Sequence, residues 1–278
     1  MMALIRQTAR ASAALAAGLM LGLGLGSPGM TALGQRETPQ RSNPQERTLD
    51  ANLFVQTSAE YVACCLQAYA WAGERLRQRL AAAPPSELPP AVIMDLDETV
   101  LDNAGFQSFL DRESKPYEQA AWDRWEREFP TETRLVPGAK GFIEAAEQAG
   151  VTVFYISNRV LPEPTIAALR HNGLSVENIG ERLLLRTDGS DKTARRKAVE
   201  EKRRVLLYVG DNLRDFSEIF MTPELKPDDA IAARRALVER HAYRFGADWI
   251  ILPNPVYGEW KTPLGKEPRR FLRPTKME

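Results

Sequence analysis

Residues 91–103 read AVIMDLDETVLDN: an apolar run of strand length ends in a cluster of acids, of which Asp95 and Asp97 come first. The apolar run predicts a buried strand. Like charges about 4 Å apart repel by roughly 4 kcal/mol at an effective dielectric of 20. A chain that crowds carboxylates at the end of a buried strand needs a positive or electrophilic group there, so this stretch predicts both a strand and a site.

Four more apolar runs follow, separated by polar turns and helix-like segments. They are VTVFYI at 151–156, RLLL at 182–185, VLLYV at 205–209 and WIIL at 249–252. Continuous apolar runs, rather than alternating ones, are typical of parallel strands that are covered on both faces. Segments with helical periodicity, GAKGFIEAAEQAG and PEPTIAALRHNG, lie between them. The sequence therefore predicts an α/β fold: a doubly wound parallel sheet between two layers of helices.

Three further segments are expected outside this repeat. More than fifty residues separate the first two strands, too many for one crossover, so we expect a helical cap at roughly 103–135. Residues 53 to about 80 have the periodicity of an N-terminal helix, which the prolines of AAAPPSELPP end. Residues 35–50 are polar and predict a flexible linker.

Residues 1–34 have the pattern of a secretory signal peptide. Arg6 and Arg10 precede an uncharged apolar run, and a small-residue site stands before Gln35; this order is typical of export signals. The run is shorter than the about 20 residues that span a bilayer, and the segment has no Cys for a lipid anchor. We expect export to the periplasm or the medium without a stable membrane anchor; an uncleaved anchor is the alternative.

The charge balance bears on the kind of partner. Thirty-seven basic and thirty-seven acidic residues give a formal net charge of zero, whereas proteins that bind nucleic acid polymers carry a basic face. The two cysteines, Cys64 and Cys65, are adjacent in a helix-periodic stretch, and neighbouring cysteines rarely satisfy disulfide geometry. We interpret both as core residues, and the charge balance argues against a nucleic acid polymer as partner.

Polar side chains follow four of the five predicted strands. In chain order they are Asp95 and Asp97, then Ser157, Asn158 and Arg159, then Lys192 in a longer loop, and then Asp211 and Asp215. The carboxyl ends of parallel strands share one edge of the sheet, where ligands bind. Taken singly, an acid pair after a strand often caps the next helix, and G-D-N is often a turn. Together, in this order, they predict one site.

The residue types in this set suit phosphoryl transfer. Asp95 could attack phosphorus and form an aspartyl-phosphate, and Asp97, which points the same way on extended backbone, could serve as the general acid and base. A divalent cation, most plausibly Mg²⁺, would be held by Asp95 and Asp211. Lys192 and Ser157 would hold the phosphoryl oxygens.

Two members of the set have supporting or open roles. Asp215, one helical turn after Asp211, would orient Lys192 or a metal-bound water. Arg159 could contact the substrate or pair with a core acid, and the sequence leaves both open.

At these residues the chain resembles the class C nonspecific acid phosphatases of the haloacid dehalogenase (HAD) superfamily, a group that includes lipoprotein 5'-nucleotidases. VIMDLDETVLDNAGF and VFYISNR resemble its two signature segments, and DKTARR, GDNLRDF and LPNPVYGEW are similar to its later blocks. The similarity covers residues from about 50 to 262. It implies a HAD-like Rossmannoid domain at 51–262 with a C-terminal tail at 263–278, an acidic pH optimum, and nucleoside 5'-monophosphates among the substrates.

The resemblance also implies roles for individual residues. Asp95 would be the nucleophile and Asp97 the acid/base, while Asp95, the backbone carbonyl of Asp97 and Asp211 would bind the metal. The supporting groups would be Ser157, Lys192 and Asp215.

Aromatic residues are expected to stack on a nucleotide base, which contributes about 1–3 kcal/mol. The expected substrate contacts are Asn158, Arg159, Phe106, Trp122, Trp125 and Tyr257, with Tyr117 as a further counterpart. Phe106 stands where the family usually has Tyr. Trp122 and Trp125, three residues apart, fit equally well as anchors of a cap helix on the core.

The sequence thus predicts an exported, Mg²⁺-dependent phosphatase that hydrolyses small phosphomonoesters through an aspartyl-phosphate. Two alternatives stay open: a phosphotransferase that uses the same site to pass phosphate to an alcohol, and a non-catalytic ligand-binding protein on the same scaffold. The oligomeric state is also open, with a homodimer as one option.

Overall fold

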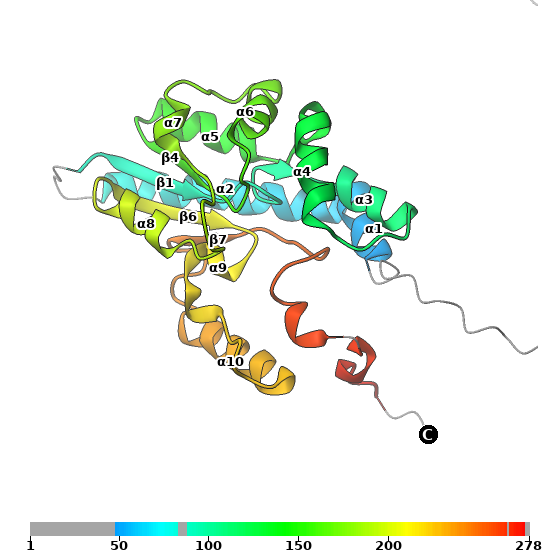
Figure 1. The fold of residues 1–278 in the computed structure, drawn as a ribbon. Coiled ribbons are helices and arrows are strands. Elements are labelled where there is room, and N and C mark those ends of the chain that lie inside the picture. The colour runs from blue at the N-terminus through cyan, green and yellow to red at the C-terminus, as the bar shows by residue number, and fades with distance from the viewer. Residues whose placement is uncertain (1–47, 83–87, 266, 276–278) are drawn as a thin grey trace, which may run out of the picture. The chain divides into compact units, whose positions relative to one another are not determined.

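Five parallel strands form the central sheet, in the order β5-β4-β1-β6-β7 (Figure 1). They are β1 (Pro90–Met94), β4 (Thr152–Ile156), β5 (Leu183–Leu184), β6 (Arg204–Gly210) and β7 (Trp249–Ile251). Each falls on one of the five apolar runs of the sequence. The predicted parallel α/β fold is therefore confirmed, and β1, the first strand in the chain, lies in the middle of the sheet.

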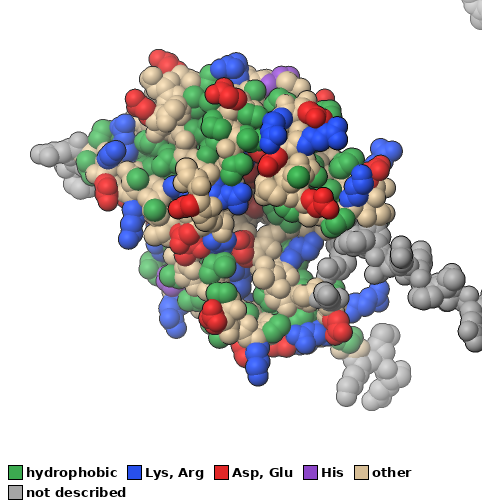
Figure 2. Space-filling model, in the orientation of Figure 1, with side chains coloured by type: hydrophobic (Ala, Val, Ile, Leu, Met, Phe, Trp, Pro, Cys, Tyr) green, Lys and Arg blue, Asp and Glu red, His purple; other side chains and the backbone are tan. Residues whose placement is uncertain are grey.

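The computed structural model describes residues 48–82, 88–265 and 267–275. The expected signal peptide lies outside these residues, as does all but the end of the expected linker. Within the described ranges, no helix is both long and apolar enough to cross a membrane. Over the face in Figure 2, basic and acidic side chains are interspersed, as the zero net charge suggests.

Both faces of the sheet are covered, which explains the continuous apolar runs. Along β1, Val92 and Met94 point into the larger core, whereas Ala91 and Ile93 point into a smaller core on the other face. Helices on both sides of the sheet contribute to these cores. The larger core takes side chains from α2 (Ala59–Ala81), α5 (Ala139–Gln148) and α6 (Pro162–His171), and the smaller core takes Val199 of α8 (Thr193–Glu200).

Six further elements in the second half of the chain lie outside the sheet, and all but α10 are short. They are α7 (Ile179–Arg182), α9 (Leu213–Phe216), η2 (Glu218–Phe220), α10 (Pro227–Arg240), η3 (Thr262–Leu264) and η4 (Pro268–Phe271).

The expected N-terminal helix is two helices, so that prediction was wrong in detail. Helix α1 (Leu49–Thr57) ends at Ser58, whose backbone is extended, and α2 begins at the next residue. The Ser58 hydroxyl accepts a hydrogen bond from the Tyr61 N–H at 3.0 Å, an N-cap that starts a new helix. Helix α1 also begins within the range expected to be linker.

The cap is an excursion from the sheet between β1 and β4. It leaves through β2 (Leu101–Asp102) and returns through β3 (Arg134–Leu135), which pair antiparallel with each other. Between them lie α3 (Ala104–Arg112), α4 (Gln119–Glu128) and the short helix η1 (Pro130–Glu132). Strands β2 and β3 therefore form a two-stranded stalk that connects the cap helices to the rest of the domain.

Helix α2 supports the loop that follows β1. The hydroxyl of Tyr69, a buried residue of α2, donates a hydrogen bond of 2.5 Å to the carbonyl of Thr99. Thr99 is fully buried and its hydroxyl in turn donates to Asp211 at 3.1 Å. The helix thus fixes the acid-rich loop from beneath.

Tyr69→Phe should lower the free energy of unfolding by about 1–2 kcal/mol, because it leaves the buried Thr99 carbonyl without this donor. Urea unfolding measures the loss. Tyr243→Phe, on a side chain that is 74% exposed, should change stability by less than about 0.5 kcal/mol. Equal losses in the two variants would contradict the assignment.

Candidate active site

Side chains from four segments meet at the carboxyl edge of the sheet. They line one cavity of about 510 Å³: Asp95 and Asp97 after β1, Asn158 and Arg159 after β4, Lys192 before α8, and Asp211 and Asp215 after β6. A cavity of this size fits a small-molecule ligand. The convergence follows from the sheet order, since β1 has β4 on one side and β6 on the other.

Lys192 lies at the centre of this group. Its Nζ pairs with Asp95 Oδ1 and lies 2.6 Å from Asp215 Oδ1, and all three side chains are buried. Burial alone would lower the pKa of Lys192, but the carboxylates of Asp215 and Asp95 outweigh it and raise that pKa. Lys192 therefore stays cationic and can offset negative charge at the site.

The acids differ from Lys192 in that their shifts favour the neutral form of the side chain. Burial raises the pKa of Asp95 well above its usual range, against the opposing effect of Lys192. Burial and the nearby Asp215 raise the pKa of Asp211 to about 7, although Asn254 donates a hydrogen bond of 2.8 Å to it. One lysine does not fully compensate these carboxylates, so the site favours a further positive charge.

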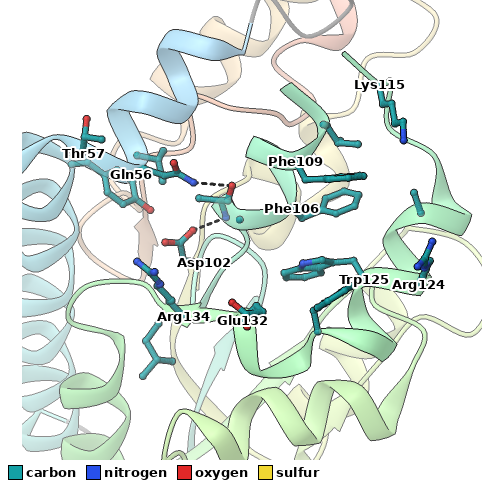
Figure 3. Close-up of a pocket in the computed structure, with 18 of the residues that line it drawn as sticks. Gln56, Thr57, Asp102, Phe106, Phe109, Lys115, Arg124, Trp125, Glu132 and Arg134 are labelled. Atoms are coloured by element: carbon teal, nitrogen blue, oxygen red, sulfur yellow. Dashed lines mark hydrogen bonds between the residues drawn. The ribbon is translucent and has the colours of Figure 1, made fainter. Parts of the chain in front are cut away.

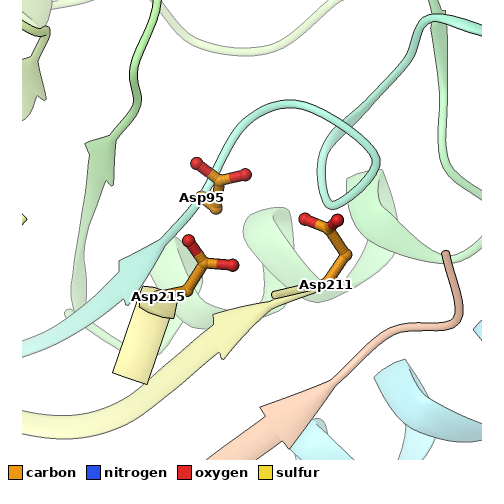
Figure 4. Close-up of side chains that lie close together, drawn as sticks. All are labelled: Asp95, Asp211 and Asp215. Atoms are coloured by element: carbon orange, nitrogen blue, oxygen red, sulfur yellow. The ribbon is translucent and has the colours of Figure 1, made fainter. Parts of the chain in front are cut away.

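Three carboxylates are grouped closely enough to share a metal ion. Asp95, Asp211 and Asp215 each offer an oxygen, and these oxygens lie within 4.8 Å of one another (Figure 4). An all-oxygen donor set suits a hard divalent cation such as Mg²⁺. The sequence assigned Asp95 and Asp211 to a metal, with Asp97 through its carbonyl; the group of side chains contains Asp215 as well.

The end of β6 and the turn after it show what Gly210 and Asn212 of the GDN segment contribute. The Asn212 N–H donates to Asp215 Oδ2 at 2.9 Å and the Asn212 side chain accepts from the Arg214 N–H, a capping box that holds Asp215. A Cβ on Gly210 would lie 2.4 Å from the Cβ of Asp215. Glycine is therefore needed at 210 for Asp215 to approach the strand.

The side chain of Asp97 is held away from the three grouped carboxylates. Its Oδ1 accepts from Arg159 Nε at 2.8 Å and from Asn103 Nδ2 at 2.9 Å, and its Oδ2 accepts from the Ser157 hydroxyl at 3.3 Å. Ser157 is fully buried and lies next to Asp97. Of the two roles left open for Arg159, the structure shows the pairing with acids, at a position that also lines the cavity.

Glu126 is the second acid beside Arg159, and it is not among the site residues that the sequence predicts. Its Oε1 lies 3.2 Å from Arg159 Nη1, and its side chain is buried. Burial raises the pKa of Glu126 to about 7, with Arg159 opposing the shift. The signal in the sequence is its place four residues after Trp122, on the same face of helix α4. Asn103 and Asn254, which hold Asp97 and Asp211, are also not among the predicted site residues.

The expected stacking residues divide between two cavities. Trp122 and Tyr257, together with Tyr117, line the cavity that contains the acids. Phe106 and Trp125 line a second cavity of about 1330 Å³ beside α1 and the cap helices (Figure 3).

Ring contacts hold the cap aromatics together. The Phe106 ring centroid lies 5.1 Å from that of Trp122 and 5.6 Å from that of Trp125. Phe106 is fully buried and Trp122 nearly so. Phe106 and Trp125 therefore act as cap core, whereas Trp122 belongs to both the cap core and the site.

The raised pKa of Glu126 predicts a pH effect on stability. In the unfolded chain the carboxyl has a pKa near 4.5 and in the folded chain one of about 7, so its contribution is full below about pH 4.5 and is lost as the pH rises through about 7. Chemical denaturation of Glu126→Gln and of the unmodified protein measures this at pH 5 and pH 8. The free energy of unfolding of the variant, relative to that of the unmodified protein, should be about 2–3 kcal/mol higher at pH 8 than at pH 5. A constant difference across that range would contradict the shift.

Comparison with known proteins places the chain. Residues 31–260 match the sequence profile of the family described as HAD superfamily, subfamily IIIB (acid phosphatase). Two solved structures of the class C acid phosphatase from Bacillus anthracis, one with tungstate bound, are similar to it, with a TM-score of 0.74 each. Their sequences are 31% and 30% identical to that of this chain. The match covers 84% of this chain and 100% of each of the two. The chain belongs to the acid phosphatase subfamily IIIB of the HAD superfamily, in its class C branch, and is a phosphomonoesterase.

Proposed function

We propose that this phosphatase is metal-dependent and works through an aspartyl-phosphate on Asp95. The observation that carries the proposal is the burial of Asp95 against Lys192, in one cavity with Asp97 and Asp211. Asp95 lies directly after the central strand, and its N–H donates to the Val209 carbonyl of β6 at 2.9 Å. The carboxylate that attacks is thus attached to the end of the central strand, which has a neighbouring strand on each side.

The reaction has two steps. In the first, an Asp95 oxygen forms a bond to phosphorus as the bond to the leaving oxygen breaks, and Asp97 donates its proton to that oxygen. In the second, water attacks the phosphorus of the aspartyl-phosphate and Asp97 takes a proton from the water. The bond between phosphorus and the Asp95 oxygen breaks, which releases inorganic phosphate and restores the Asp95 carboxylate. Asp97 is held ready for both steps by Arg159 and Ser157.

Charge compensation falls to Lys192 and a divalent cation. Lys192 Nζ lies between two carboxylates, where it can also meet a phosphoryl oxygen as negative charge builds up in the transition state. The residues that fit a cation are Asp95 and Asp211, with the Asp97 carbonyl, and Asp215 completes the group of carboxylates. When bound, Mg²⁺ would screen the repulsion between these acids and an anionic phosphate.

We also propose nucleoside 5'-monophosphates among the substrates. Tyr117, Trp122 and Tyr257 line the cavity that contains the acids, and every base has a face that can stack on an aromatic ring. Asn158 lines the same cavity and can bind a polar group of the substrate. The wider class is small phosphomonoesters, because the cavity holds about 510 Å³.

The protein is further proposed to be exported, with a signal peptide at 1–34 and the catalytic domain at 51–262. Determining the N-terminus of the mature protein from its native source checks this part. An N-terminus near Gln35 supports it, and retention of residues 1–34 in a cytoplasmic product contradicts it.

Asp95→Asn should abolish turnover, by at least about 10⁴-fold, because the amide cannot attack phosphorus and its size is unchanged. Turnover of p-nitrophenyl phosphate measures the loss, and circular dichroism checks that the fold is retained. Residual activity within about tenfold of the unmodified protein would remove Asp95 as the nucleophile.

Asp211→Asn should weaken Mg²⁺ binding by at least about tenfold, since it removes one anionic ligand. Isothermal titration of the EDTA-treated protein with Mg²⁺ measures the affinity without relying on turnover. The control is Asp229→Asn, on an exposed side chain of α10. Equal affinities in the two variants would argue against the metal assignment, and full activity in EDTA would argue against metal dependence.

Tyr257→Ala should raise KM for a nucleoside monophosphate by roughly 5- to 150-fold, the equivalent of about 1–3 kcal/mol of stacking. The KM for p-nitrophenyl phosphate, which carries no base, serves as the internal reference. If both values rise equally, Tyr257 contributes to the cavity in general and not to base recognition.

A further inference from the structure

Helix α4 of the cap carries a buried acid, Glu126, that contacts Arg159 beside the active-site cavity. The two-step reaction gives this acid no role. The side chain of Glu126 is fully enclosed, and its Oε1 lies 3.2 Å from Nη1 of Arg159, whose side chain is 1% exposed. A buried carboxylate is costly unless it is paired. Neither residue contacts solvent freely, so their pairing is a fixed part of the structure.

Arg159 connects this acid to Asp97. Its Nε and Nη2 lie 2.8 Å and 2.7 Å from Asp97 Oδ1, and Nη2 also donates to Asn103 Oδ1 at 2.9 Å. The guanidinium is a planar, rigid fork. Whatever fixes the direction of Nη1 therefore also fixes the direction of the two nitrogens that hold Asp97.

The same helix contacts Arg159 a second time. The ring of Trp122, one turn before Glu126 on α4, lies 5.5 Å from the guanidinium carbon of Arg159. Arg159 therefore has a cation–π contact with Trp122 and an ion pair with Glu126, both from α4. The cap thus contacts Arg159 through two side chains, while the backbone of Arg159 belongs to the segment that follows β4.

We propose that Glu126 is a positioning residue: through Arg159 it aims the Asp97 carboxyl at the leaving-group oxygen. The inference rests on the proposed function, in which Asp97 is the general acid. It gives the cap a part in the chemistry as well as in substrate recognition. A misplacement of about 1 Å at a reacting group can cost about 100-fold in rate, so the orientation of Arg159 matters.

The role has a readout that a purely structural role lacks. As the phosphorus–oxygen bond breaks, the O–H bond of Asp97 breaks and a new O–H bond forms on the leaving alcohol. An alkoxide needs this proton, whereas p-nitrophenolate leaves without it. A misoriented Asp97 carboxyl should therefore lower kcat/KM for alkyl phosphates more than kcat/KM for p-nitrophenyl phosphate.

The experiment compares ethyl phosphate with p-nitrophenyl phosphate in three variants. Glu126→Leu removes both carboxyl oxygens, whereas Glu126→Gln keeps the side-chain length and one oxygen that can lie beside Nη1 of Arg159. Glu128→Leu is the matched control, on the same helix and in an exposed ion pair with Arg124.

For Glu126→Leu we expect kcat/KM for ethyl phosphate to fall roughly 10- to 100-fold and that for p-nitrophenyl phosphate to change by less than about threefold. Glu126→Gln and Glu128→Leu should stay within about threefold of the unmodified protein on both substrates.

Equal losses of Glu126→Leu on both substrates, or no loss on either, would overturn the inference. Asp97→Asn is the reference for the acid itself. If Asp97→Asn shows no selective loss, the acid assignment of the proposed function fails. If it shows selective loss and Glu126→Leu does not, only the role of Glu126 fails.

Should Glu126→Leu not fold, Glu126→Asp is measured in the same way. This variant keeps the carboxylate but shortens the side chain by one methylene group. It therefore tests whether the distance between the carboxylate and Arg159 matters. A selective loss on ethyl phosphate supports the inference, and a uniform loss or none overturns it.

Discussion

The pairing of one ammonium group with two buried carboxylates is the constraint on which the active site depends. Lys192 lies between Asp95 and Asp215, and Asp211 is close by. Three carboxylates against one ammonium leave two negative charges, which equals the charge of one divalent cation with opposite sign. Burial raises the pKa of Asp95 and of Asp211, as expected where negative charge is incompletely compensated. The site is therefore built for a cation that completes the balance and for a phosphate that then meets a less negative surface.

The parallel sheet makes this pairing possible between residues far apart in the chain. Strands β1 and β6 are hydrogen-bonded neighbours, and adjacent strands lie about 4.8 Å apart. Asp95 and Asp211 each follow the last residue of their strand. A tight turn after Gly210 then brings Asp215 to Lys192. Backbone regularity thus sets the spacing of the carboxylates before any side chain adjusts.

Much of this could be predicted from the sequence, because it follows from local pattern. All five strands coincide with apolar runs, and Asp95, Arg159 and Asp211 of the cavity come within three residues of the end of their runs. What could not be predicted depends on contacts between distant segments. Helical periodicity continues through Ser58, so the sequence hides a break that the extended backbone of Ser58 and its side-chain cap reveal. The spacing of Trp122 and Trp125 does not tell which of two cavities each ring faces. Glu126 reads as a surface acid of a charged helix until Arg159, 33 positions later, is placed beside it.

The stalk formed by β2 and β3 has a consequence for how this fold can diversify. Leu101 pairs with Leu135 and Asp102 with Arg134, so the chain enters and leaves the cap at adjacent points. A segment with neighbouring ends can be exchanged as a unit, here called a cassette. Its length and sequence can vary while the register of the central strands stays the same. New substrate preferences can then be grafted onto an unchanged reaction centre. The limit is Arg159, since any replacement cassette must still supply an acid that reaches its guanidinium.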